Sequence, residues 1–238
     1  MDVIAFLQFC AYAALCTACF TGSQALFAII CGVRLEEIQL FYGRRLVTVV
    51  VHQVKVSVGW IPTGSFAKFR TRASSADELM PRSSIPTDTF DDVHPIARAF
   101  IILSGPISLL VLACTLSPPR NVAAEAVETF GQFWEGARHP FVVGPELIGR
   151  ALKFIGDSTV AIGLSTVAAK FAAINSIPIP LFAGGQALFT LIQWKRTDYE
   201  KYVKQQVGVS LIGVVVLSAF LVGWALAIGT FVIRQLGF

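Results

Sequence analysis

The residues whose types and spacing could support chemistry gather between Asn175 and Gln186. This stretch reads Asn-Ser-Ile-Pro-Ile-Pro-Leu-Phe-Ala-Gly-Gly-Gln, and the sequence on either side of it is apolar. Prolines and paired glycines interrupt a helix, and an interruption at membrane depth frees N–H and C=O groups that only protein or a cavity can cover. Polar side chains at such a point typically mark a functional site inside a membrane protein.

Outside this stretch, the residue types that bind metals are scattered. The histidines, His52, His94 and His139, lie in three separate segments, so we expect a structural or solvated role for each. All five cysteines fall in apolar segments, where thiols behave as small apolar side chains. Cys16 and Cys19 have the Cys-x-x-Cys spacing, but no further Cys or His lies at zinc-site distance along the chain. We therefore expect these thiols to pack.

A serine nucleophile is the remaining catalytic option, and it needs a base. Ser23, Ser104 and Ser176 could each face a cavity near the polar stretch, and Lys170 lies five residues before Asn175. Because a lysine near the end of a span usually extends its amine to the lipid headgroups, a Ser–Lys dyad is a minor alternative.

The elements that must position these residues are membrane-spanning helices. Hydrophobic residues make up 55% of the chain, charged residues only 14%, and the mean hydropathy is +0.68. These values are typical of integral membrane proteins. We expect one membrane domain covering residues 1–238. Its four spans are predicted at residues 3–33, 99–116, 158–174 and 207–233.

The distribution of Lys and Arg predicts the orientation of these spans. Residues 34–98 and 195–206 carry thirteen Lys and Arg, whereas residues 119–157 and the C-terminal tail carry five. Since cytoplasmic connections are enriched in these residues, we expect both termini outside. The expected location is a bacterial cytoplasmic membrane.

Three connections have recognisable patterns. β-branched and alternating residues predict half-buried strands over residues 47–69, with a turn at 62–65. The Ser-, Thr-, Asp- and Pro-rich segment 70–94 is typical of a cytoplasmic loop. Residues 119–157 alternate apolar and acidic residues, which predicts an amphipathic helix that lies on the outer membrane surface or packs against the bundle.

Four stretches of the sequence together resemble the site-2 proteases, which are intramembrane zinc metalloproteases. The stretch from Asn175 resembles the family's Asn-x-x-Pro-x-Pro-x-x-Asp-Gly-Gly. Residues 31–43 are similar to its Gly-Val-x-Val-Glu-x-Phe, and residues 61–69 to its Pro-x-Gly-Gly-Tyr-Val-Lys, with serine for the second glycine. Residues 98–109 resemble Arg-Ala-x-x-x-x-x-Gly-Pro-x-x-Asn, with leucine for the asparagine. The resemblance covers roughly residues 18–195 and implies the family's bundle with a β-hairpin that dips into the membrane.

The resemblance also implies a zinc site, and its ligands are missing from this sequence. In the family, His-Glu-x-x-His on the first helix supplies two ligands and a glutamate that activates water, and the aspartate of the later motif supplies the third ligand. Ala183 stands at the aspartate position. Counting back from Gly32 places Phe20, Thr21 and Gln24 at the His, Glu and His positions. We therefore expect a degenerate former active site without metal or cofactor.

Three polar residues, Ser23, Asn175 and Gln186, remain near this former site. Unsatisfied polar groups are costly inside a membrane bundle. We expect these side chains, with Thr21 and Gln24, to form hydrogen bonds across helices and to fill the space left by metal and water.

The sequence thus predicts an α-helical integral membrane protein with a four-span bundle like that of the site-2 proteases and a small membrane-associated β-hairpin. We expect a catalytically inactive binding, scaffold or regulatory subunit that contacts the bilayer and a segment of a partner membrane protein, and no nucleic acid. Two alternatives remain: a divergent hydrolase that uses serines with Lys170 or a partner's metal, and a small-solute or lipid pathway. The candidate partner-binding residues are Val49, Val54, Val56, Ile61, Gly64 and Phe66.

Overall fold

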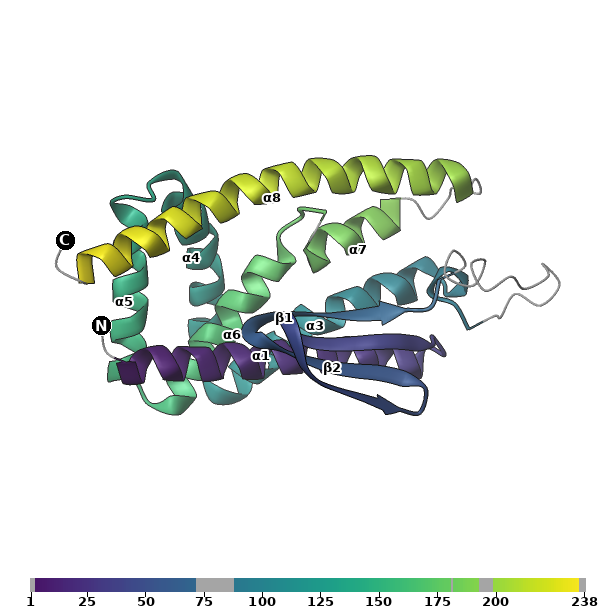
Figure 1. Cartoon of the computed structure of the whole chain (residues 1–238), viewed down its shortest axis with the longest axis horizontal. Coiled ribbons are helices and arrows are strands. Elements are labelled where there is room, and N and C mark those ends of the chain that lie inside the picture. Colours follow the sequence, from purple (N-terminus) through teal and green to yellow (C-terminus); the bar gives the residue numbers. More distant parts are fainter. Residues whose placement is uncertain (1–2, 72–87, 181, 193–198, 236–238) are drawn as a thin grey trace.

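The computed structural model describes residues 3–71, 88–180, 182–192 and 199–235. Within these ranges the chain is mostly helical, with one small sheet beside the first helix (Figure 1). In chain order the elements are α1 (Val3–Ile30), β1 (Leu35–Val51), β2 (Val54–Phe69), the 3-10 turn η2 (Phe90–Asp92), α3 (Pro95–Leu116), α4 (Pro119–Arg138), α5 (Val143–Asp157), α6 (Val160–Ser176), α7 (Ala183–Ile192) and α8 (Tyr199–Gln235). A helical architecture with one small sheet is the predicted fold class.

Three of the described helices are long and apolar enough to cross a membrane: α1, α3 and the Gly213–Gln235 part of α8. They correspond to three of the four predicted spans. The remaining one, residues 158–174, corresponds to α6. The 17 residues of α6 lie at the lower end of the about 17–25 residues that a span requires. α7 is apolar but shorter still.

Capping residues set where the shorter helices begin. The Nδ1 atom of His94 accepts a hydrogen bond from the Ile96 N–H at 3.4 Å, and Pro95 occupies the first turn of α3. The hydroxyl oxygen of Thr159 accepts from the Ile162 N–H at 3.4 Å at the start of α6. Each cap satisfies an N–H group that has no partner within its helix.

The core lies where α1, α3 and α6 meet. Small buried residues dominate it, among them Ala113, Ala168 and Ala172, and such residues let helix backbones approach closely in a membrane. The Ser165 hydroxyl donates to the Ala113 carbonyl at 3.0 Å and links α6 to α3. These contacts hold α6, and the helix break that follows it, against α1 and α3.

The predicted outer connection, residues 119–157, forms two helices rather than one. α4 and α5 lie across the end of the molecule at which α1 begins and α8 ends (Figure 1). Trp224 of α8 donates its indole N–H to the Phe133 carbonyl of α4 at 3.2 Å, and the rings of Phe133 and Phe220 stack 5.2 Å apart. Of the two alternatives that the sequence leaves open, packing against the bundle is therefore the one observed.

β1 and β2 form one antiparallel sheet that begins earlier than predicted. The sheet starts at Leu35 rather than at residue 47, because β1 continues through Phe41 and Gly43. The positive φ angles of these two residues, 66° and 89°, bend the strand instead of ending it. His52 and Gln53 also have positive φ and form the two-residue turn at the tip of the hairpin.

Because both strands bend, the sheet contains four paired segments. Residues 47–51 pair with 54–58, and residues 37–40 pair with 65–68, in the antiparallel sense. Residues 37–40 also pair with the 54–58 segment, and these two segments run parallel to each other. The segments 47–51 and 65–68 are therefore the two edges of the sheet.

The predicted loop 70–94 is described only at its ends, because residues 72–87 lie outside the described residues. At its far end, the Phe90 N–H donates to the Arg70 carbonyl at 2.8 Å. The returning chain therefore covers the end of the sheet edge formed by residues 65–68.

Candidate functional site

Three of the four predicted former active-site positions meet around Ile102 of α3. The ring of Phe20, from α1, packs against the buried cluster that contains Ile102 and Ala183. Gln24, one helical turn after Phe20, donates its side-chain amide to the Ile102 carbonyl at 2.9 Å. The residues that the sequence resemblance assigns to the two histidines and the aspartate therefore lie together, on α1 and at the start of α7.

The phenyl ring of Phe20 fills the centre of this arrangement. A Cβ atom on Gly105 of α3 would lie 2.6 Å from the ring, so the ring fits because residue 105 has no side chain. The buried neighbours Ala99, Ala183 and Ala187 are also apolar. Phenyl and methyl groups offer no lone pair to a cation, so these side chains pack helices together and supply no metal ligand.

Thr21, at the position of the catalytic glutamate in the family pattern, faces the sheet. Its side chain is fully buried, and its hydroxyl forms a hydrogen bond with the Ser65 hydroxyl of β2. Ser65 stands where the family pattern has its second glycine. This hydrogen bond joins α1 to the sheet edge 65–68. Neither hydroxyl is as basic as the carboxylate that the family pattern has at residue 21.

The polar residues predicted around the site behave in different ways. The Ser23 hydroxyl lies 3.1 Å from the Ser104 carbonyl and 3.0 Å from the Ser108 hydroxyl, so it bridges α1 and α3 as expected. Asn175, in contrast, donates its amide to the Phe171 carbonyl of its own helix at 2.9 Å. Gln186 is exposed on α7, so it does not fill the space around Phe20.

The glycine pair of the motif has a structural role that needs no metal. α6 ends at Ser176 and α7 begins at Ala183, which is the helix break that the prolines predict. A Cβ atom on Gly184 would overlap the Ser176 carbonyl, and one on Gly185 would overlap the Ile179 carbonyl. Both positions require glycine because the backbone folds back on itself there.

The histidines are dispersed, as the sequence predicts. His52 lies in the hairpin turn and His94 caps α3. His139 follows α4, and its backbone N–H donates to the Glu135 carbonyl at 3.0 Å. Among the residues that the structure describes, no group of three or more His, Cys, Asp or Glu is placed to hold a metal ion.

The serine–lysine alternative is not assembled. Lys170 places its amine 3.1 Å from a Glu125 carboxylate oxygen and donates to the Gln132 side-chain oxygen at 2.8 Å, both on α4. The Ser176 hydroxyl donates to the Ala172 carbonyl of its own helix at 2.8 Å. In the described part of the chain, no hydrogen bond joins Lys170 to a serine.

The predicted partner-binding residues differ in exposure. Val49, Ile61 and Phe66 are exposed, whereas Val54 and Val56 are half-buried in the second segment of the sheet. Gly64 has a φ of 69° and bends β2 within the predicted turn at 62–65, which lies inside the strand. Only Val49 lies on the 47–51 edge.

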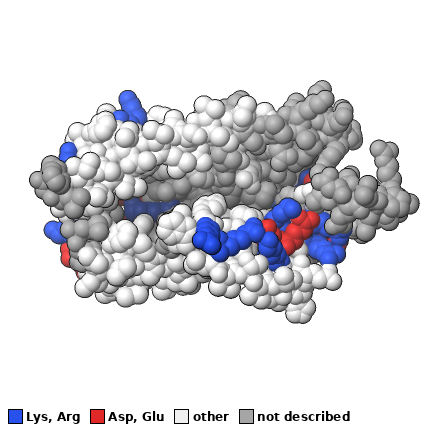
Figure 2. Space-filling view, in the orientation of Figure 1, with Lys and Arg blue, Asp and Glu red and all other residues white. Residues whose placement is uncertain are grey.

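Charges on the face shown in Figure 2 gather over the sheet, and most of the described surface around them is uncharged. Two ion pairs belong to this group, Arg45 with Glu37 at 2.7 Å and Lys68 with Glu36 at 2.8 Å. The hydrogen bond and charge of Glu36 raise the pKa of Lys68. The sheet thus combines paired charges at its base with apolar residues along one edge.

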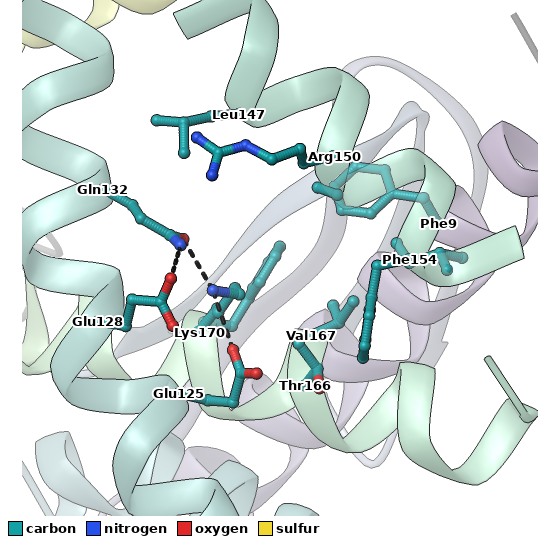
Figure 3. A pocket seen from close by; sticks show the side chains of 13 residues that line it. Phe9, Glu125, Glu128, Gln132, Leu147, Arg150, Phe154, Thr166, Val167 and Lys170 are labelled. Carbon is teal, nitrogen blue, oxygen red and sulfur yellow. Dashed lines mark hydrogen bonds and ion pairs between the residues drawn. The ribbon is translucent and has the colours of Figure 1, made fainter. Parts of the chain in front are cut away.

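Sequence reasoning missed a cavity between α4, α5 and α6 (Figure 3). Lys170 enters it from α6, and Glu125, Glu128 and Gln132 enter it from one face of α4. The signal was available, because acidic and amide residues three and four positions apart share a helix face, and a lysine inside an apolar segment needs a partner.

The comparison with known families agrees with this geometry. The profile of peptidase family M50, the site-2 protease family, matches residues 25–220. A comparison with individually curated proteins gives no match. The family match covers most of the chain, including the sheet, Gly105 and the Asn175–Gln186 break, and it begins at residue 25, after Phe20, Thr21 and Gln24. The chain is therefore an integral membrane protein that belongs to peptidase family M50.

Proposed function

We propose that this protein is a non-catalytic member of the family that binds an extended segment of a partner membrane protein. The observation that carries the first half of the proposal is the ring of Phe20, which lies beside Ala183 and occupies the place where the family pattern would bring zinc ligands together. Peptide hydrolysis by zinc needs three ligands and an open position for water. Phe20, Gln24 and Ala183 provide neither.

The second half of the proposal rests on the sheet edge 47–51. Val49 and Val50 on this edge are 52% and 67% exposed, and Leu46 just before it is 66% exposed. The opposite edge is held by Thr21 of α1 and by the chain at Phe90. An exposed apolar edge strand is a liability unless another chain pairs with it, so a partner strand added to residues 47–51 is the interaction that this surface favours.

The turn geometry identifies the backbone groups that such a partner would use. In a hairpin closed by a two-residue turn, residues 51, 49 and 47 direct their N–H and C=O groups to the neighbouring strand. Thr48 and Val50 then direct theirs to the open edge. A proline at position 50 removes an outward donor, whereas a proline at position 49 breaks the hairpin itself.

This difference gives a matched experiment. A photo-crosslinking amino acid at Thr48 in the full-length protein should capture a partner polypeptide in membranes. Val50→Pro should abolish the crosslink while membrane insertion and melting temperature stay close to those of Val50→Ala, and Val49→Pro should lower the melting temperature. A crosslink that survives Val50→Pro, or its absence when the crosslinking residue at position 48 is the only change, contradicts edge-strand binding.

The family's usual activity, metal-dependent proteolysis, is the competing function, and a chelator distinguishes it. A metal that binds the folded state raises its stability, so removal of a resident metal lowers the melting temperature. We expect the melting temperature in mild detergent to be the same with and without chelator. A clear fall that zinc reverses would favour the protease.

We also propose that both termini lie outside a bacterial cytoplasmic membrane, from the excess of Lys and Arg in residues 34–98 and 195–206. Val127 on α4 and Gln53 at the hairpin tip lie on opposite sides in this arrangement. In a cysteine-free background, Val127→Cys should react with an impermeant thiol reagent in intact cells, and Gln53→Cys should react only after lysis. Equal labelling of both in intact cells contradicts the orientation.

A further inference from the structure

The cavity between α4, α5 and α6 is separate from the Phe20 cluster and does not depend on the proposed function. It has a volume of about 230 Å³, which corresponds to roughly eight water molecules at ~30 Å³ each. A drug-sized ligand usually needs ~300–1,000 Å³. The cavity is therefore large enough for a small polar headgroup and too small for a whole lipid or peptide.

One wall of the cavity carries an ordered polar network. Lys170 is paired with Glu125 at 3.1 Å and donates to Gln132 at 2.8 Å. The other end of the Gln132 amide donates to a Glu128 carboxylate oxygen, so Figure 3 shows a continuous chain from Glu125 through Lys170 and Gln132 to Glu128. Lys170 pairs with Glu125, and among the described residues the Glu128 carboxylate has no cationic partner.

Arg150 supplies the remaining charge from the opposite helix. Its guanidinium and the side chain of Leu147 both come from α5, and Figure 3 shows them on the same side of the view as Gln132 of α4. Within the described residues it has no hydrogen bond or ion pair. Arg150 from α5 and Glu128 from α4 thus line the same cavity without contacting each other. A ligand that carries both a negative and a positive charge would pair with both side chains.

The other wall of the cavity is apolar. It is formed by Phe9 of α1, Phe154 of α5, and Val167 and Phe171 of α6. Phe154 is 40% exposed, so the apolar wall continues to the surface of the molecule. α5, together with α4, crosses the end of the membrane helices, where amphipathic helices meet headgroups and acyl chains. A charged wall next to an apolar wall is the environment that an amphiphile requires.

We infer that this cavity binds the headgroup of a zwitterionic phospholipid with a primary amine, of the phosphoethanolamine type. Its phosphate lies on Arg150, which can donate two N–H groups to one phosphate. Its ammonium lies on Glu128, and the start of an acyl chain lies along Phe9 and Phe154. An anionic lipid satisfies Arg150 but places a second negative charge near Glu128, so the charge balance favours the zwitterion.

The test is lipid retention by the full-length protein. The protein is reconstituted in nanodiscs that contain equal amounts of phosphatidylethanolamine, phosphatidylcholine and phosphatidylglycerol, released into mild detergent, and analysed by native mass spectrometry. We expect one phosphatidylethanolamine retained per chain. Arg150→Gln should lower that retention about tenfold, the loss of roughly one charge-assisted contact.

A second variant tests the amine. Glu128→Gln should remove the preference for phosphatidylethanolamine over phosphatidylcholine, because the methylated amine of choline cannot donate a hydrogen bond to a carboxylate. The matched controls remove one charge of the same sign from the same helix outside the cavity: Lys153→Gln on α5 and Glu135→Gln on α4. Both should retain the lipid as the unmodified protein does.

Three results would overturn the inference. Retention of phosphatidylglycerol at or above the level of phosphatidylethanolamine would mean that the cavity prefers anionic lipids to the zwitterion. Retention that is equal in Arg150→Gln and Lys153→Gln would place the lipid elsewhere. The absence of any retained lipid would mean that only water occupies the cavity.

Discussion

The cluster around Ile102 and the cavity around Lys170 have opposite characters. The first contains the positions of the family's zinc ligands, yet its side chains are the phenyl ring of Phe20 and the methyl group of Ala183, with one amide from Gln24. The second has no counterpart in the family pattern, yet two acids and two bases line it. The side chains around Ile102 thus pack helices together, whereas the charged groups line the cavity around Lys170.

The motif persists at the first site because of its backbone. Gly184 and Gly185 lie so close to the carbonyl groups of Ser176 and Ile179 that no Cβ atom fits. Gly105 leaves room for the ring of Phe20 in the same way. None of these glycines depends on a bound ion. Close packing of the backbone therefore accounts for these glycines whether or not the site binds a metal.

The largest expected effect in this comparison is on the Phe20 cluster. Phe20→Ala leaves a void between α1, α3 and α7, and should lower the free energy of unfolding by about 3 kcal/mol, the lower end of the range for Phe→Ala in a core. Phe6→Ala is the control, because Phe6 lies on the same helix and is exposed. Unfolding in detergent measures both, and equal losses would mean that Phe20 does not fill the site.

The next effect concerns the glycine pair. Gly185→Ala forces a methyl group onto the Ile179 carbonyl and should cost about 2 kcal/mol, typical of overpacking. Gly22→Ala on α1 meets nothing within 4 Å and should leave stability unchanged or raise it. Thermal melting of the two variants gives the comparison. A Gly185→Ala protein as stable as the unmodified one would remove the backbone explanation for the motif.

The smallest effect belongs to the charged cavity. A double-mutant cycle of Lys170→Met and Glu125→Gln should give a coupling energy of about 1 kcal/mol, because both side chains are less than one-third exposed. The same cycle on Lys68 and Glu36, a pair with a more exposed lysine, should give a smaller value. Chemical unfolding measures both cycles. A larger coupling at the surface pair would mean that the Lys170 network is not an ordered part of the fold.

Sequence patterns predicted the helix break after Ser176 because prolines and glycines report local backbone geometry. The grouping of Phe20, Gln24 and Ala183 around Ile102 is a feature of the tertiary structure. The same holds for the partners of these residues: Gln24 bonds to a carbonyl 78 residues away, and Thr21 to a hydroxyl 44 residues away. Such contacts depend on how α1 packs against α3 and the sheet.

The start of the sheet was predicted too late for a related reason. Residues 35–39 read Leu-Glu-Glu-Ile-Gln, with none of the β-branched enrichment that marks residues 47–51. They form a strand because segments on both sides pair with them, and such tertiary pairing overrides local propensity. The cavity around Lys170 was missed because its charges come from different helices.

Zinc content measured by elemental analysis tests the central claim most directly. The full-length protein is purified in mild detergent, treated with a weak chelator, and compared with a variant that carries Phe20→His, Thr21→Glu, Gln24→His and Ala183→Asp. We predict well under one zinc per chain in the unmodified protein and a gain toward one in the variant, because the three positions that receive ligands, 20, 24 and 183, already lie together. Near-stoichiometric zinc in the unmodified protein would contradict the account.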